Sequence, residues 1–137
     1  MPSASHVLAA RRKMIVSRLT LATSAAALMM VSAAAADNAA PSYQGDPETY
    51  KVVFEDQSFR VIAATWKKGV TDKPHSHPLP FVVYALDECT IRVHNPDGST
   101  RELANKPGAV FAGAITASHM AENISANDCH AIMVERK

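Results

Sequence analysis

The order of apolar and polar residues after residue 50 predicts a series of short β-strands. Segments 50–56 and 59–66 are rich in β-branched and aromatic residues, and polar turns follow each of them. Segments of the same kind recur at residues 81–86, 89–94, 99–104, 109–111, 120–124 and 130–135. No segment after residue 36 combines helix caps with a 3.6-residue apolar period. Strands at spacings of roughly 8 to 12 residues predict an all-β sandwich or barrel.

The first 36 residues have a different pattern, which is typical of an export signal. Basic residues at 11–18 precede a moderately apolar stretch at 19–31, and alanines at 34–36 offer a small-residue cleavage site. The apolar stretch is short and interrupted by Thr and Ser, so it does not predict a stable membrane span. We therefore expect residues 1–36 to be a cleaved signal peptide and the protein to be periplasmic or secreted.

Met14 is a second candidate for the start of the chain, and the two starts predict different export routes. From Met1, the pair Arg11-Arg12 loosely resembles a twin-arginine signal, which exports folded proteins. From Met14, the remaining segment is an ordinary secretory signal. The alternative for this segment is an amphipathic helix in the mature fold, but no sustained helical period supports it.

Removal of the signal would leave a small acidic domain. Taking 36 residues from 137 leaves 101, which suffices for one hydrophobic core. The signal holds four of the 14 basic residues and none of the 13 acidic ones, so the remaining formal charge is −3. A negative charge argues against nonspecific nucleic-acid binding. Residues 37–49, rich in Ala, Asn, Pro, Ser and Gly, predict a flexible arm, and 50–137 form the domain.

Three histidines are the candidate metal ligands. His75 and His77 stand one residue apart before a run with strand character, so their side chains can point to the same side. Two imidazoles on one face supply half of a metal site. His119, in the segment after the turn at 106–108, is the third candidate. We expect His94 to be solvated, and we assign no ligand role to His130.

The segments that hold these histidines resemble the two motifs of the cupin superfamily. The first motif is Gly, five residues, His-x-His, three or four residues and Glu, and Gly69, His75 and His77 follow its spacing. The second is Gly, five residues, Pro-x-Gly, two residues, His, three residues and Asn. This chain matches it at Gly108, His119 and Asn123, with Ala114 and Thr116 in place of Pro and Gly. The resemblance implies a small jelly-roll β-barrel with the metal inside its mouth.

The first motif lacks its usual Glu, since Phe81 or Val82 stands at that position. The resemblance then implies three neutral imidazoles with open positions for water or substrate, similar to the three-His iron centre of thiol-dioxygenase-like cupins. Without the carboxylate, the site should bind a divalent ion less tightly and be more electrophilic, or be a relic. The ligands do not distinguish Fe, Zn, Cu, Mn and Ni, although the Irving–Williams order favours Zn or Cu in a protein exported unfolded.

Two functions are compatible with this site. One is a metal-dependent enzyme, dioxygenase-like or isomerase-like, that acts on a small molecule. The other is a non-catalytic module that binds a small molecule or a metal. Catalytic residues are unknown, because the only acidic residue within the second motif, Glu122, has no assigned direction. The residues expected to line the substrate pocket are Leu79, Phe81, Val83, Phe111 and Met133.

Strand alternation supports this pocket but leaves the opposite face unexplained. If the alternation continues from His77, then Phe81 and Val83 point inwards with it. Val82 and Tyr84 on the other face are also apolar, so a covering partner such as a second copy in a homodimer would account for both faces. The aromatic residues Tyr43 and Tyr50 are interpreted as packing residues.

Cys89 and Cys129 are the only cysteines of the chain. An even number in an exported protein suits a disulfide, and two separate buried thiols are the alternative. A disulfide requires Cα atoms roughly 4.4 to 6.8 Å apart, and the sequence does not give that distance.

Overall fold

The computed structural model describes residues 38–137, in which strands predominate. The signal peptide predicted for residues 1–36 lies outside the described residues. One sheet has the strand order β1-β2-β9-β4-β7, and its members are β1 (Tyr50–Glu55), β2 (Phe59–Trp66), β4 (Phe81–Ala85), β7 (Val110–Gly113) and β9 (Cys129–Arg136). The other has the order β3-β8-β5-β6, and its members are β3 (His75–His77), β5 (Cys89–His94), β6 (Thr100–Asn105) and β8 (Thr116–Asn123).

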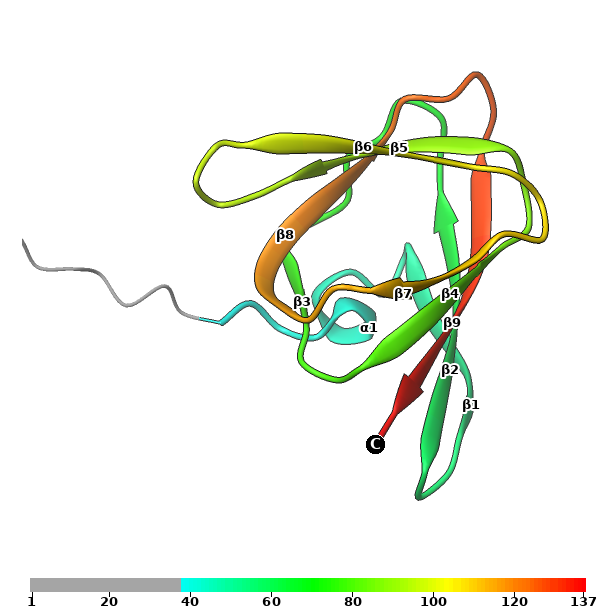
Figure 1. The fold of residues 1–137 in the computed structure, drawn as a ribbon. Helices are drawn as coiled ribbons and strands as arrows, with labels where there is room; N and C mark the ends of the chain where they lie inside the picture. The colour runs from blue at the N-terminus through cyan, green and yellow to red at the C-terminus, as the bar shows by residue number, and fades with distance from the viewer. Residues whose placement is uncertain (1–37) are drawn as a thin grey trace, which may run out of the picture. The chain divides into compact units, whose positions relative to one another are not determined.

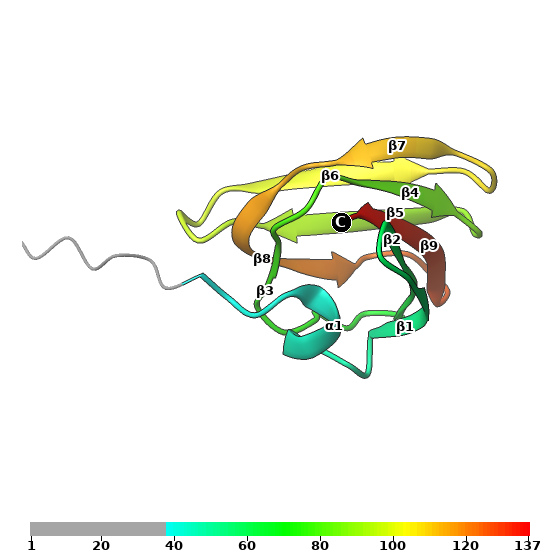
Figure 2. The same ribbon diagram turned by 90° about the horizontal axis from the view of Figure 1, so that it is seen from below.

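The two sheets face each other and enclose the apolar core. Figure 1 shows β5, β6 and β8 on one side and β4, β9 and β2 on the other, and Figure 2 gives the view from below, in which the strands of the two sheets overlap. Burial alternates along β4, β5 and β9, so every second side chain points between the sheets. The buried side chains Ile62, Val83 and Met133 contribute to this core. The prediction of an all-β fold is therefore confirmed.

The sheets do not close into one barrel, so the predicted barrel is not the arrangement of residues 38–137. Strands β1 and β7 are the edges of one sheet, and β3 and β6 are the edges of the other. No backbone ladder of the described chain joins these edges across the sheets. The structure is thus a sandwich of two sheets, with buried side chains from both sheets between them.

The two histidines of β3 and the strand that follows them belong to different sheets. Pro78 and Pro80 lie on either side of Leu79, and because proline cannot donate a ladder hydrogen bond, no strand continues through this segment. Strand β4 then begins at Phe81 in the five-stranded sheet. The condition for continuous alternation from His77 therefore fails, although Phe81 and Val83 are buried as predicted.

Residues 38–49 are attached to the domain, whereas a flexible arm was predicted for residues 37–49. The backbone of this segment is hydrogen-bonded from Ala39 N to Ala117 O at 3.0 Å and from Ser76 N to Ala40 O at 2.9 Å. A single helical turn, α1 (Ser42–Gly45), follows and packs beside β1 and β3 in Figure 1. The arm thereby covers the free edge of β3, which is the strand that carries two of the candidate ligands.

A disulfide links Cys89 at the start of β5 to Cys129 at the start of β9, with Cα atoms 5.8 Å apart. Because β5 and β9 belong to different sheets, this bond joins the two layers covalently. It closes a loop of 40 residues, and the chain-entropy model assigns such a loop a stabilisation of about 4 kcal/mol. Of the two alternatives for the cysteines, the structure contains the disulfide.

The outer face of the five-stranded sheet carries exposed apolar side chains. Val82, Tyr84 and Val110 are 43, 45 and 62 % exposed, and they lie on the neighbouring strands β4 and β7. A second copy of the chain that covers this face stays a prediction.

Within residues 38–137, helices reach neither the length nor the apolar content that a membrane crossing requires.

Candidate metal centre

His75, His77 and His119 come together on neighbouring strands of the four-stranded sheet. Strands β3 and β8 are antiparallel, and His75 is the direct partner of His119. The register shifts by one residue before His77, whose partner is Thr116. This irregularity brings the His77 ring to within 5.0 Å of the His119 ring, measured between centroids. One nitrogen from each imidazole lies within 4.8 Å of the other two, so the three rings form a single cluster.

Hydrogen bonds fix the orientation of His75, which is fully buried. Its Nδ1 lies 2.9 Å from the carbonyl oxygen of Lys73, which can only accept, so we assign the proton to Nδ1. In the neutral ring, Nε2 is then left with its lone pair, which faces Nε2 of His119 at 2.9 Å. A histidine that ligates a metal usually donates the N–H of one ring nitrogen to a backbone carbonyl and offers the lone pair of the other nitrogen to the ion.

A buried carboxylate stands behind His75. Asp72 accepts hydrogen bonds from the hydroxyl of Tyr50 at 2.6 Å, from Nε1 of Trp66 at 3.1 Å and from the backbone N–H of Ala121 at 2.7 Å. Burial raises the pKa of Asp72, while the nearby His75 and the donated hydrogen bonds oppose this rise. The Tyr50 oxygen also lies 3.2 Å from Nε2 of His75, the nitrogen that faces the cluster. Burial and the adjacent Asp72 raise the pKa of Tyr50 well above its usual value.

The other two imidazoles are held in their neutral form. Burial, followed by the charges of His75 and His119, lowers the pKa of His77 to about 3. Burial, followed by the charges of His75 and Arg101, lowers the pKa of His119 to about 4. At neutral pH both rings therefore present lone pairs, and neutral imidazole is the form that binds metals.

Backbone contacts between the two motif segments place these histidines. Gly69 N donates to Asn123 O at 2.9 Å, and Asn123 N donates to Val70 O at 3.1 Å. Gly69 has a φ of 71° and Gly108 a φ of 83°, a region that favours glycine. The buried Asn123 side chain donates to backbone carbonyls of Trp66 and Asn127 and forms no hydrogen bond with the three histidines. Gly69 and Asn123 therefore join the two motif segments, whereas Gly108 turns the chain beside Ala85 at the far end of β4.

Phe81 fills the place of the missing carboxylate. It stands four residues after His77, and its ring stacks on the His77 ring with centroids 4.4 Å apart. The ring lies directly over Gly113 of the neighbouring strand, where a Cβ atom would come within 1.9 Å of it. The side chain that occupies this position is thus apolar and closely packed.

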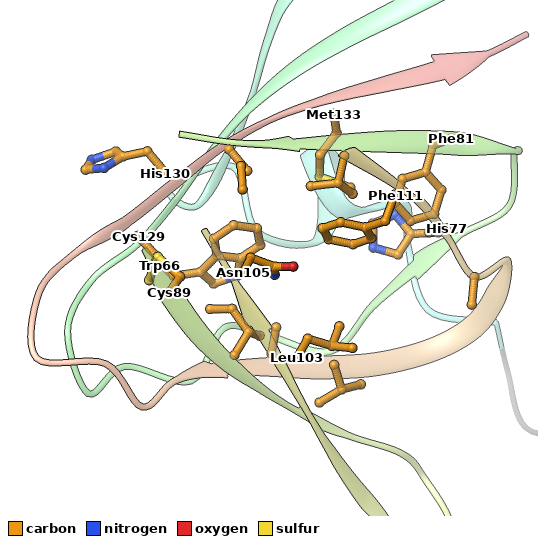
Figure 3. A pocket seen from close by; sticks show the side chains of 18 of the residues that line it. Trp66, His77, Phe81, Cys89, Leu103, Asn105, Phe111, Cys129, His130 and Met133 are labelled. Atoms are coloured by element: carbon orange, nitrogen blue, oxygen red, sulfur yellow. A yellow bond between two sulfur atoms is a disulfide. The ribbon is translucent and has the colours of Figure 1, made fainter. Parts of the chain in front are cut away.

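A cavity lies between the two sheets, and His77 and His119 are among the residues that line it. Figure 3 shows His77 at one end of this cavity. The space not filled by atoms measures about 750 Å³ when its open mouth is included. His77 and Phe81 lie at one end in Figure 3, and the Cys89–Cys129 disulfide lies at the other. The walls between them are mostly apolar, with side chains that include Val83, Ile91, Leu103, Phe111 and Met133.

Four of the five predicted pocket residues line this cavity, and Leu79 does not. The four are Phe81, Val83, Phe111 and Met133. Leu79 lies in the break between β3 and β4, where the strand alternation that predicted its direction no longer applies. That these side chains bind a substrate stays a prediction.

The remaining candidates lie away from the three histidines. The Glu122 carboxylate bonds His94 at 2.9 Å and Arg92 at 3.3 Å, so it does not serve the cluster as a base. His130 bonds Asp87 beside the disulfide. Sequence reasoning missed Asp72 and interpreted Tyr50 only as a packing residue. The position of Asp72 between Gly69 and His75 was the one available signal.

The three imidazoles fit a transition-metal ion. In the described chain neither nitrogen of His77 has a hydrogen-bond partner, and its Nδ1 is buried. Buried polar atoms are seldom left without partners, so the unpartnered Nδ1 of His77 is an argument that this site holds a ligand. Imidazole donors suit Zn, Cu, Fe and Ni, and three of them leave open positions for a further ligand.

Comparisons with known proteins give a likeness in fold. No family model matches the chain, and no curated protein matches it. A cupin domain from Bordetella pertussis has a TM-score of 0.59 at 17 % identity, over 64 % of this chain and 91 % of that one. An RmlC-like cupin from Methanocaldococcus jannaschii, with a double-stranded β-helix fold, has a TM-score of 0.52 at 9 % identity, over 64 % and 77 %. An uncharacterised protein from Klebsiella pneumoniae with a double-stranded β-helix domain has a TM-score of 0.51 at 19 % identity, over 64 % and 74 %.

Proposed function

We propose that this chain, which has the cupin fold, binds a divalent transition-metal ion through His75, His77 and His119 and uses it to bind a small molecule in the cavity. The observation that carries the proposal is the cluster of three imidazoles around one point at the end of an apolar cavity. Such an ion, when bound, supplies a Lewis acid with open positions. The chain's own residues orient the ligands, exclude water and select the molecule that enters.

Two of the chain's residues are placed to orient the ligands. Asp72 and the backbone carbonyl of Lys73 both face Nδ1 of His75, at 3.6 and 2.9 Å. The carbonyl fixes the tautomer, and the carboxylate adds a negative charge behind the ring. Tyr50, bonded to the same carboxylate, brings a hydroxyl next to the metal-facing nitrogen.

Conversion of the bound molecule, in a dioxygenase-like or isomerase-like reaction, is the finer form of the proposal. The Tyr50 hydroxyl is the proton-bearing group that supports it, because its oxygen lies 3.2 Å from Nε2 of His75. A non-catalytic binding module is the second candidate. It is favoured because neither acidic candidate is free to act as a base. Asp72 is committed to Tyr50, Trp66 and Ala121, and Glu122 to Arg92 and His94.

Export to an oxidising compartment is also proposed. The Cys89–Cys129 disulfide supports it, because such bonds form and persist mainly outside the cytoplasm. In that setting the Irving–Williams order favours zinc or copper at three imidazoles. Iron or manganese would need a route that loads the protein before export.

Metal titration tests the proposal. Calorimetry and elemental analysis of the purified chain should give about one equivalent of zinc, which a His119→Ala variant should lose, because two imidazoles form an incomplete chelate. His130→Ala is the matched control, since His130 lines the same cavity but lies apart from the cluster. Undiminished stoichiometry in His119→Ala, or an equal loss in His130→Ala, would reject the three-histidine site. Turnover of any compound by the zinc- or iron-loaded protein would then exclude the non-catalytic module.

A further inference from the structure

We propose that the cavity binds an organic anion, whose charged group lies between the metal centre and Arg101 and whose apolar body extends along the cavity. This inference rests on the proposed metal site and adds the charge and polarity of the molecule that the site takes. A carboxylate with a cyclic or branched hydrocarbon body is the simplest molecule of this class. The observations that carry it are the position of Arg101, its lack of a partner and the charge balance at the histidines.

Arg101 faces the cavity from the inner side of the four-stranded sheet. It lies on β6 opposite Val93, and Val93 lies opposite Ala121 on β8, the strand that carries His119. The alternate β6 residues Arg101, Leu103 and Asn105 all line the cavity. Arg101 is exposed as well as lining the cavity, and it is near enough to His119 for its charge to contribute to the lowered pKa of that ring.

The guanidinium of Arg101 has no carboxylate partner within residues 38–137. Arg92 of the neighbouring strand, by contrast, is paired with Glu102 at 2.9 Å and with Glu122 at 3.3 Å. Among the residues that line the cavity in the described chain, Arg101 is the single Lys or Arg. Asp87 is the single carboxylate of the same set, and it is bonded to His130. A cation is therefore left available at the histidine end of the cavity.

Charge balance at the metal site adds a second reason for an anion. Three neutral imidazoles leave the charge of a divalent ion uncompensated, and the carboxylate of the family motif is replaced by Phe81. Asp72 is the nearest carboxylate, but it lies behind His75 and accepts three hydrogen bonds there. The side of the site that opens to the cavity thus combines an uncompensated ion with an arginine, and both favour a carboxylate.

The apolar walls of the cavity are the reason for proposing an apolar body for the ligand. Side chains of Val83, Ile91, Leu103, Phe111 and Met133 line the cavity beyond the histidines, and they offer few hydrogen-bond partners. A polar ligand would lose its hydration there without compensation, whereas a hydrocarbon body gains free energy from leaving water. The charged group is consequently expected at the histidine end only.

Trp66 provides a direct readout, because it is the only tryptophan of the chain and it lines the cavity. The zinc-loaded protein is titrated with cyclohexanecarboxylate and with its near-isosteric neutral analogue, cyclohexanecarboxamide, while Trp66 emission and heat are recorded. The same titrations are made on Arg101→Gln, on Arg101→Lys and on Arg92→Gln, the matched control from the neighbouring strand. Each is repeated after the metal has been removed with a chelator.

We expect the carboxylate to bind the zinc-loaded protein about tenfold or more tightly than the carboxamide, since hydrogen bonds to charged groups are the stronger ones. Arg101→Gln should reduce this preference roughly fivefold, Arg101→Lys should retain most of it, and Arg92→Gln should leave it unchanged. Equal affinity for the two probes, or an equal effect of the two Gln variants, would overturn the inference.

The same experiment separates this inference from the proposed metal site. If zinc does not bind, the proposed function fails, and the metal-free titrations still report whether Arg101 favours the carboxylate. If zinc binds with the expected stoichiometry but the carboxylate has no advantage, the metal site stands and the anionic ligand is rejected.

Discussion

The two ends of the cavity are built from different kinds of interaction. At the disulfide end, Cys89 and Cys129 join the sheets covalently, and Asp87 is paired with His130. At the histidine end, three imidazoles face one another, and a buried nitrogen of His77 has no partner within the described residues. The first end holds the layers together. The second contains buried polar groups that lower the stability of the fold, which is common at functional sites.

Loss of the disulfide should have the largest effect on stability and should leave the histidine end unchanged. The double variant Cys89→Ala/Cys129→Ala frees a loop of 40 residues, which should lower the free energy of unfolding by about 4 kcal/mol. Guanidinium denaturation measures this change, and calorimetry should still give the wild-type zinc stoichiometry. Loss of zinc binding in a variant that remains folded would show that the two ends are not independent.

Replacement of Asp72 tests whether the histidine end has a supporting structure of its own. Asn keeps the size of the side chain, but its amide group places N–H donors against groups that donate to the Asp72 carboxylate in the wild type. Asp72→Asn should therefore lower the free energy of unfolding by about 3 kcal/mol. It should also weaken zinc binding about tenfold, because it removes the charge behind His75. A zinc competition assay measures the second effect.

Asp128→Asn is the control for Asp72→Asn, since Asp128 forms an exposed pair with Lys67. Its replacement should leave the free energy of unfolding nearly unchanged, because exposed ion pairs contribute little to stability. Equal effects of the two variants would mean that Asp72 has no special place in the site.

Acid should weaken the histidine end of the metal-free protein. In the folded chain the pKa of His77 is lowered to about 3 and that of His119 to about 4, whereas an unfolded histidine titrates near 6.5. Between these values the unfolded chain binds more protons, so this contribution to stability is full above about pH 7 and declines as the pH falls. A drop from pH 6 to pH 5 should cost about 2 kcal/mol.

Denaturation midpoints across this pH range measure the effect. A His77→Gln/His119→Gln variant should show a flatter dependence, because Gln does not titrate. An equally steep dependence in that variant would assign the acid sensitivity to other groups.

The smallest effect is expected from His94, which belongs to neither end. Its imidazole bonds the Glu122 carboxylate at 2.9 Å on a partly exposed surface. His94→Gln should leave the zinc content unchanged and should shift the free energy of unfolding by less than about 1 kcal/mol. A loss of half the zinc would mean that the ligands are wrongly assigned.

Sequence spacing was sufficient to predict that the three histidines come together, and insufficient to predict their surroundings. Motif spacing identified His75, His77 and His119, because backbone pairing between β3 and β8 depends on local features that a motif preserves. Leu79 is not among the residues that line the cavity, and strand alternation does not apply to it, since two prolines end one strand and the next begins in another sheet. The hydrogen bond of Tyr50 to Asp72 spans 22 residues, and alternation along a strand does not predict contacts of that kind.

The disulfide shows the same limit. Cys89 and Cys129 are 40 residues apart in the chain, and their pairing depends on how β5 and β9 face each other across the core. Packing of two sheets sets that distance, and strand patterns alone do not contain it.

The position of β9 has a consequence for biosynthesis. This strand is translated after every other strand of its sheet, yet it lies in the middle, hydrogen-bonded to β2 on one side and to β4 on the other. Until residues 129–136 have left the ribosome, β1-β2 and β4-β7 are two separate pairs of strands, each with unpaired edges. The five-stranded sheet can therefore form only after β9 has been synthesised, and the unpaired strands of the nascent chain make a holding chaperone an advantage.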